Sequence, residues 1–111
     1  MIHKMKLNNE PFNGIKNGYK TIEMRLYDEK RRLVNVGDVI EFTNINTNEV
    51  ISVEVIKLHL FNDFEELYNQ FNKVSIGYKE NEEACSSDMN KYYSIEEQDK
   101  YGVVGIEIKL K

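Results

Sequence analysis

Three charged side chains, Lys20, Glu23 and Arg25, lie within six residues of one another and are the strongest candidates for chemistry in this chain. A lysine amine can act as a base or a nucleophile, and the planar fork of an arginine fits a phosphate or a base edge. A glutamate can relay a proton. This combination indicates the wall of a site for a polar, anionic ligand; the alternative is a simple solvated face.

The residues around this group predict a β-strand over residues 21–26. Apolar and polar side chains alternate from Thr21 to Leu26. Because successive side chains of a strand point to opposite faces, one face should be buried and the other should carry a hydroxyl, a carboxylate and a guanidinium. The side chains of that polar face are Thr21, Glu23 and Arg25, and Lys20 enters at the preceding turn.

The polar face allows two interpretations. Shielding from water and the like charge of Arg25 would favour the neutral amine of Lys20, which could then act as a base or nucleophile near neutral pH. Glu23 or Glu80 could shuttle a proton, and Arg25 could hold an anionic oxygen. In the other interpretation, Glu23 forms an internal ion pair with Lys20 or Arg25 that only fixes the local structure.

Length and composition predict one globular domain over residues 1–111. The chain has 111 residues, 41% hydrophobic and 31% charged, which is typical of a single core in water. No apolar run reaches the roughly 18 residues that span a bilayer. Because residues 1–7 lack the apolar core of a signal peptide and Cys85 has no partner for a disulfide, we expect a cytoplasmic protein. We expect no metal or cofactor, since His3 and His59 are isolated.

The charge distribution bears on the class of partner. The net charge of −4 argues against tight binding to a nucleic acid duplex, which requires many neutralised phosphates. Lys30, Arg31 and Arg32 form a local basic run. This run is either part of a small nucleotide or nucleic acid site or a solvated loop.

The pattern of elements predicts an α+β fold. Period-two alternation and turn signals predict strands over residues 5–7, 21–26, 39–43, 50–60 and 104–110. Helices are expected over 10–17, after a cap at Asn62 with Glu65 as its capping-box partner, over 82–93, and after a capping box at Ser94. We expect a small, mostly antiparallel sheet that curves into a barrel, with short helices packed outside.

This order of elements resembles the ASCH domain, a small β-barrel of the PUA-like superfamily, over nearly the whole chain. The resemblance rests on a helix that ends at Gly18 and on Lys20, Glu23 and Arg25 as a GxKxxExR signature. A Gly37-Asp38 strand entry follows, and the segments 91–94 and 101–106 look like those of the bacterial single-domain branch. The resemblance implies a cleft that binds RNA or a nucleoside, and no membrane.

Some small bacterial members of this family are amidohydrolases that deacetylate 4-acetylcytidine with a lysine, a threonine three residues later and a distant glutamate. The resemblance places Lys20 at the lysine, Glu23 where the threonine would be and Glu80 at the distant glutamate. Since a carboxylate cannot replace the threonine hydroxyl as a nucleophile, turnover stays open. The alternative is a non-catalytic protein-interaction module.

The resemblance and the strand pattern together also suggest residues that bind the substrate. Arg25 and Thr21 belong to the polar strand face. In family members, the segment that faces the signature corresponds to a tyrosine-rich part of this chain, with Tyr78, Tyr92, Tyr93 and Tyr101. Tyrosine rings can stack on bases. Of these we select Tyr93 as a substrate-binding residue.

Overall fold

Five strands form a single sheet in the computed structural model, which describes residues 1–111. The strands are β1 (Ile2–Leu7), β2 (Ile22–Leu26), β3 (Val39–Asn44), β4 (Val50–Phe61) and β5 (Val103–Leu110). Their order in the sheet is β1-β3-β4-β5-β2. The β1–β3 pair is parallel and the other three pairs are antiparallel, which confirms the mostly antiparallel sheet expected from the sequence.

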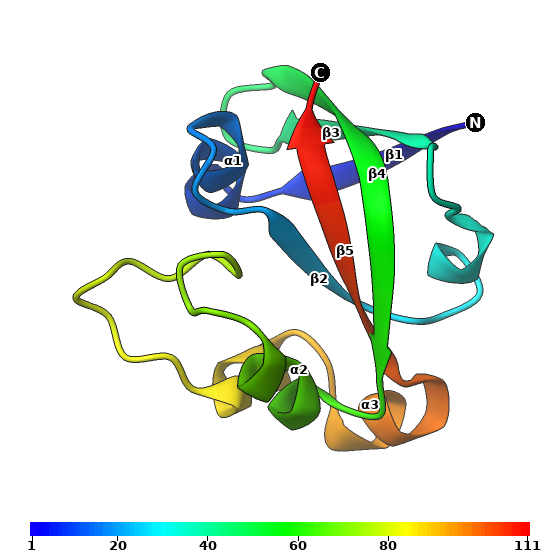
Figure 1. Cartoon of the computed structure of the whole chain (residues 1–111), viewed down its shortest axis with the longest axis vertical. Coiled ribbons are helices and arrows are strands. Elements are labelled where there is room, and N and C mark those ends of the chain that lie inside the picture. Colours follow the sequence, from blue (N-terminus) through cyan, green and yellow to red (C-terminus); the bar gives the residue numbers. More distant parts are fainter.

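The sheet curls into a half-barrel whose two edges are β1 and β2 (Figure 1). The long strand β4 makes this curvature possible, because it pairs with β3 through its first half and with β5 along most of its length. An irregularity in the β4–β5 register between Val55 and Lys57 bends the strand, as β-bulges do. The backbones of β1 and β2 do not pair, so both edge strands leave polar groups free for side chains.

Two hydrophobic cores hold the sheet. Twelve buried residues, with Phe12, Ile40 and Phe42 among them, fill the half-barrel and include the inner face of helix α1 (Asn9–Lys16). Eight others form a second core between the sheet and the helices of residues 64–101. The apolar face of β2, with Ile22 and Met24, belongs to this second core. Strand β2 therefore has one face toward the helices and the other toward the inside of the half-barrel.

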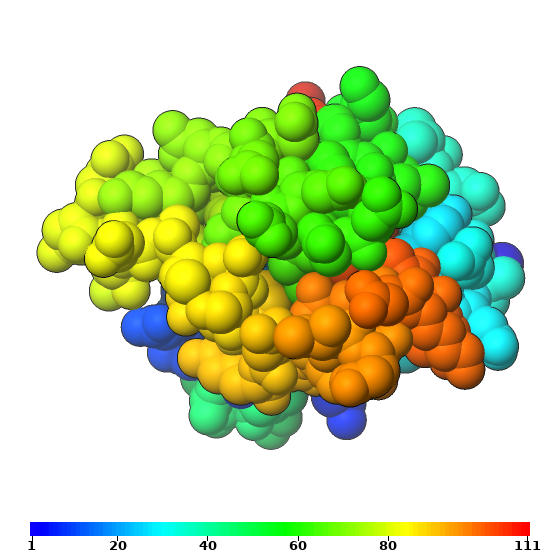
Figure 2. Space-filling view, turned by 90° about the horizontal axis from the view of Figure 1, so that it is seen from below, coloured from blue at the N-terminus to red at the C-terminus, as the bar shows by residue number.

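Short helices cover one end of the half-barrel. Helix α2 (Phe64–Gln70), the 3-10 helix η2 (Ser86–Lys91) and helix α3 (Ile95–Tyr101) lie together at this end, and Figure 2 shows residues 64–101 spread over it. Another short element, η1 (Arg31–Leu33), lies in the expected loop over residues 27–36. The capping box at Ser94 is confirmed, and so is the end of α3 at Gly102. None of these helices is long and apolar enough to cross a membrane.

The structure corrects two helix predictions. The predicted helix over residues 82–93 is only a 3-10 helix over Ser86–Lys91, because the extended backbone of Cys85 does not allow helical turns before Ser86. Helix α2 begins one residue later than expected. Asp63, and not Asn62, is its N-cap, and the Asp63 side chain accepts a hydrogen bond of 2.9 Å from the backbone of Glu66.

Candidate functional site

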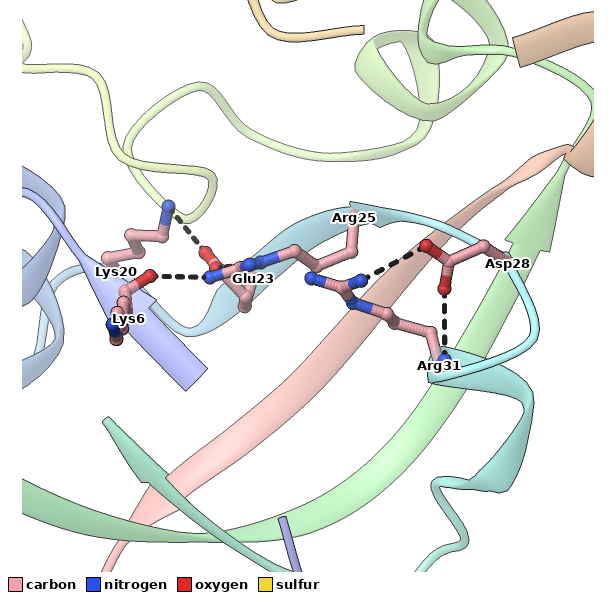
Figure 3. A network of polar contacts seen from close by, with 6 residues as sticks. All are labelled: Lys6, Lys20, Glu23, Arg25, Asp28 and Arg31. Atoms are coloured by element: carbon pink, nitrogen blue, oxygen red, sulfur yellow. Dashed lines mark hydrogen bonds and ion pairs between the residues drawn. The ribbon is translucent and has the colours of Figure 1, made fainter. Parts of the chain in front are cut away.

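Glu23 joins Lys20 and Arg25 in one network on the inner side of β2. Its Oε1 lies 3.1 Å from Lys20 Nζ, and its Oε2 accepts a hydrogen bond of 2.7 Å from Arg25 Nε (Figure 3). The exposed fractions of the side chains are only 4% for Glu23, 7% for Lys20 and 12% for Arg25. The polar face of this strand is therefore not a solvated face.

Arg25 also connects the two edges of the curled sheet. Its Nη2 donates a hydrogen bond of 2.9 Å to the backbone carbonyl of Lys6 in β1, as Figure 3 shows. An edge strand leaves such carbonyls free, and the guanidinium satisfies this one. The side chain thus bridges β2 and β1 where their backbones do not pair, and it holds the network at the mouth of the half-barrel.

The charges of the network stabilise one another. Burial alone would raise the pKa of Glu23, but the nearby Lys20 and Arg25 outweigh it and hold this pKa below its ordinary value of 4.5. Burial would likewise lower the pKa of Arg25, and Glu23 more than offsets it. At neutral pH, Glu23 is therefore an ionised acceptor and not an acid. It also separates Lys20 from Arg25, so that Lys20 meets a carboxylate where a like charge was expected.

The loop that follows α2 closes over Lys20. The carbonyl of Ser75 accepts hydrogen bonds of 2.9 Å from the backbone N–H groups of Thr21 and Ile22, which ties the loop to the start of β2. Gly77 then passes so near to Lys20 that a β-carbon added to it would lie 3.3 Å from Lys20 Cδ. The loop shields the lysine from water on this side.

A cavity of about 390 Å³ opens beside the network. Glu23, Arg25 and Lys20 line it, and so does Met24, whose side chain belongs to the other face of β2. Since β2 is an edge strand, residues from both of its faces can line the same cavity. Its volume lies within the roughly 300–1,000 Å³ typical of small-molecule sites.

Aromatic side chains border the same cavity. They are Tyr68, Tyr78, Tyr92 and Tyr93. Tyr93 stacks on Phe64 with 5.8 Å between the ring centres and an angle of 20° between the planes, which fixes its ring. Burial raises the pKa of Tyr93 although Arg25 acts in the opposite direction, so its phenol stays neutral. These rings offer faces and hydroxyl groups to a ligand.

The structure gathers most of the residues predicted from the sequence, but not all of them. Lys20, Glu23, Arg25 and Tyr93 line the cavity. Thr21 and Glu80 are exposed and do not line it. Tyr101 is also absent from the lining, unlike the other tyrosines that we expected to face the signature.

The basic run over residues 30–32 lies outside the cavity as well. Arg31 pairs with Asp28 at 3.0 Å, and the guanidinium of Arg32 lies 4.3 Å from the ring centre of Tyr27. Two of its three cations are thus engaged within the loop itself. This arrangement favours the structural interpretation of the run.

Sequence reasoning missed several lining residues. Glu82 and Asp88 line the cavity, as do Tyr68 and Gly77. They come from segments without a recognisable motif. Only the tyrosine-rich composition of the C-terminal half gave a signal for any of them.

Comparisons with known proteins identify relatives over the whole chain. The family model of the ASCH domain matches residues 5–111. Hypothetical protein PH0355 has a crystal structure that is 35% identical, with a TM-score of 0.84, and the match covers 100% of both chains. Protein PF0455 from Pyrococcus furiosus is 33% identical, with a TM-score of 0.73, over 99% of this chain and 97% of that one.

A more distant structure shows the same fold. The crystal structure of ASCH from Zymomonas mobilis has a TM-score of 0.70 at 14% identity, over 97% of this chain and 66% of that one. No curated protein matches the chain. Because Pyrococcus furiosus is an archaeon, these relatives do not single out the bacterial branch that the sequence resembled.

Proposed function

From the premise that this chain belongs to the ASCH domain family, we propose that its cavity binds a nucleoside or a single base of RNA. One observation carries this proposal: a buried network of two cations and one carboxylate opens onto a cavity bordered by four tyrosines. A polar cluster of this kind next to aromatic faces suits a ligand that is flat and has several hydrogen-bond acceptors.

The hydrogen-bond inventory favours acceptors on the ligand. Glu23 uses both of its oxygens for Lys20 and Arg25. The lysine ammonium has three N–H donors and the guanidinium has five, so donors remain on both after the bonds within the chain are made. A base carbonyl, a ring nitrogen or a phosphate oxygen would satisfy them.

The net charge fits a small contact surface. With a charge of −4, the chain is a poor partner for a long duplex, whereas one extruded or single-stranded base meets few phosphates. We therefore expect a weak dependence of the affinity on salt. Stacking on a tyrosine ring would add roughly 1–3 kcal/mol per base.

The test is calorimetry of the wild type and of Arg25→Ala against cytidine, uridine and short single-stranded RNAs. Removal of Arg25 should weaken binding by about tenfold or more, because the guanidinium offers charge-assisted hydrogen bonds. Lys57→Ala, at an exposed lysine outside the cavity, is the matched control and should bind like the wild type. Equal affinity of Arg25→Ala and the wild type, or no binding by either, contradicts the proposal.

A second candidate, hydrolysis of the amide of 4-acetylcytidine, is favoured by the buried amine of Lys20 at the cavity wall. In this reaction water adds to the acetyl carbonyl, the C–N bond breaks, and acetate and cytidine leave. To act as the base or nucleophile, Lys20 would first have to pass its ammonium proton to water, because only the neutral amine has a free lone pair. The ionised Glu23 would orient Lys20 and would neither attack nor donate a proton. Since Glu80 lies outside the cavity, a second carboxylate would have to come from a lining residue such as Glu82.

Cytidine release from 4-acetylcytidine tests this candidate. We would compare the wild type with Lys20→Ala and Glu23→Thr, and use Glu80→Gln to test the distant carboxylate. Release that depends on Lys20 would support hydrolysis. No release by the wild type from mildly acidic to mildly basic pH excludes turnover of this substrate and leaves the binding proposal standing. Activity gained only by Glu23→Thr would identify the natural chain as a binding relative of the enzymes.

A further inference from the structure

A second polar group borders the cavity and takes no part in the network of Lys20, Glu23 and Arg25. The hydroxyl oxygen of Tyr78 lies 2.6 Å from Asp88 Oδ2 and 2.9 Å from the hydroxyl oxygen of Tyr68. All three residues line the cavity. The rings of Tyr68 and Tyr78 meet edge to face with 5.9 Å between their centres, so that packing fixes both hydroxyl groups.

The direction of the hydrogen bonds in this group follows from the number of protons. A phenol has one proton to donate, and an ionised carboxylate has none. The contact of Tyr78 with Asp88 is its shortest, at 2.6 Å against 3.2 Å to the carbonyl of Cys85. Tyr78 therefore donates to Asp88, and Tyr68 donates to Tyr78.

Both phenols keep their protons at neutral pH. Burial raises the pKa of Tyr68 and of Tyr78, and the hydrogen bond to Asp88 raises that of Tyr78 further. Every proton of the group is thus used within it. What remains for a ligand are lone pairs on Asp88 and on the oxygen of Tyr68, so the group can only accept hydrogen bonds.

The two groups that border the cavity are complementary in polarity. Around Glu23, the free positions are N–H donors of Lys20 and Arg25. Around Asp88, the free positions are acceptors. A ligand that satisfies both must carry at least one acceptor and one N–H or O–H donor, because polar groups that the bound ligand shields from water need a new partner.

We propose that Asp88, held in place by Tyr78 and Tyr68, is a specificity-determining acceptor that selects ligands with a hydrogen-bond donor. This inference rests on the proposed binding of a nucleoside. Such a ligand offers two sources of donor, the base, through the exocyclic amine of cytosine, or the ribose, through its 2′-hydroxyl group. A carbonyl oxygen placed against Asp88 is repelled, which disfavours a ligand with an acceptor at that position.

Three nucleosides separate the two sources. Cytidine has an amine and an unprotonated ring nitrogen where uridine has a carbonyl and an N–H, so the base donor changes its position on the ring, and 2′-deoxycytidine lacks the 2′-hydroxyl group. We expect the wild type to bind cytidine about tenfold or more tightly than one of the other two, as for a charge-assisted hydrogen bond. Weak binding of uridine assigns the donor to the base, and weak binding of 2′-deoxycytidine assigns it to the sugar.

Calorimetry with Asp88→Asn measures the role of the carboxylate. The amide keeps the shape but carries no charge and adds N–H donors, so the selectivity should fall to less than about threefold. Tyr78→Phe removes the hydroxyl group that holds Asp88 in place, so it should lower the selectivity as well. Asp99→Asn, at an exposed aspartate that does not line this cavity, should keep the selectivity of the wild type. Thermal melting checks that each variant is folded.

The outcomes distinguish this inference from the function on which it rests. Binding of all three nucleosides with equal affinity overturns the role of Asp88 and leaves nucleoside binding intact. If the folded Asp88→Asn variant keeps the selectivity of the wild type, the role of Asp88 is likewise overturned and nucleoside binding is left intact. If the wild type binds none of the three nucleosides and no short single-stranded RNA, both the selectivity and the proposed function are wrong.

Discussion

A β-carbon added to Gly77 would lie 3.4 Å from the ammonium nitrogen of Lys20. Gly77 has a φ of +115°, a backbone conformation that L side chains rarely adopt. The backbone of the loop over residues 72–81 and the buried lysine therefore meet in a way that only glycine permits. This contact places one wall of the cavity against the cation that we expect to bind the ligand.

Gly77→Ala should weaken ligand binding several-fold, because the new methyl group lies 3.3 Å from Lys20 Cδ and shifts the lysine side chain by a few tenths of an ångström. It should also lower the free energy of unfolding by about 1–2 kcal/mol through backbone strain. Gly37→Ala is a matched control, since Gly37 has a φ of +92° but no atom within 4 Å of an added β-carbon. Chemical denaturation and calorimetry of both variants separate the two effects. If both variants lose similar stability and bind the ligand with equal affinity, the Gly77–Lys20 contact does not matter for binding.

Local patterns predicted the strand that carries the site. The alternation from Thr21 to Leu26 reflects the pleat of a strand, and it correctly placed Ile22 and Met24 in a core. The ion pairs of Glu23 were also one of the two interpretations open from the sequence. The alternation lies in residues that are neighbours in sequence, so a single sequence is enough to recognise it.

The burial of the polar face could not be predicted in the same way. It depends on contacts between distant segments, such as Arg25 with the carbonyl of Lys6 and Lys20 with Gly77. Tyr78 and Asp88 meet because η2 replaces the helix that local propensity favoured. Nothing in the spacing of these residues indicates the fold of the loop that brings them together.

Helix α2 offers a direct test of the corrected cap. Asp63→Ala should lower the free energy of unfolding by about 1 kcal/mol, because the Asp63 side chain satisfies the backbone N–H of Glu66. Asn62→Ala should lower the free energy of unfolding by only a few tenths of about 1 kcal/mol, because the Asn62 side-chain amide makes an exposed hydrogen bond of 3.3 Å to Glu66. Urea denaturation measures both. If Asn62→Ala loses more stability than Asp63→Ala, then Asn62 is the N-cap, as predicted from the sequence.

Arg25→Lys should reduce stability although it keeps the charge. A lysine ammonium cannot reproduce the planar fork that binds the Glu23 carboxylate and the Lys6 carbonyl together. Loss of one charge-assisted bond lowers the free energy of unfolding by about 1.5–3 kcal/mol. Urea denaturation measures the loss. The control is Lys57→Arg at an exposed lysine, where the change in the free energy of unfolding should stay within about 0.5 kcal/mol. Equal effects in the two variants would refute the bridging role of Arg25.

The last prediction concerns the pH dependence of stability. The folded protein holds the pKa of Glu23 below 4.5, so the ionised carboxylate contributes stability above this pH and loses it as the pH falls through the lower, folded pKa. Glu23→Gln leaves Lys20 and Arg25 without their counter-charge and should lower the free energy of unfolding at neutral pH by about 3 kcal/mol. The difference from the wild type should narrow below about pH 4.5, where the carboxylate of the unfolded chain begins to bind a proton, and should level off below the lower pKa of the folded protein.

Urea denaturation of both proteins over this pH range measures the difference directly. The pKa of Asp38 is also lowered, through a hydrogen bond from His3, but both proteins share this residue and its contribution cancels. Glu80→Gln changes an exposed carboxylate that has no ion pair and should match the wild type throughout. If the difference between wild type and Glu23→Gln stays constant from neutral to acidic pH, the carboxylate is not held by Lys20 and Arg25 in the folded state. The buried network would then not be the charged wall on which ligand binding depends.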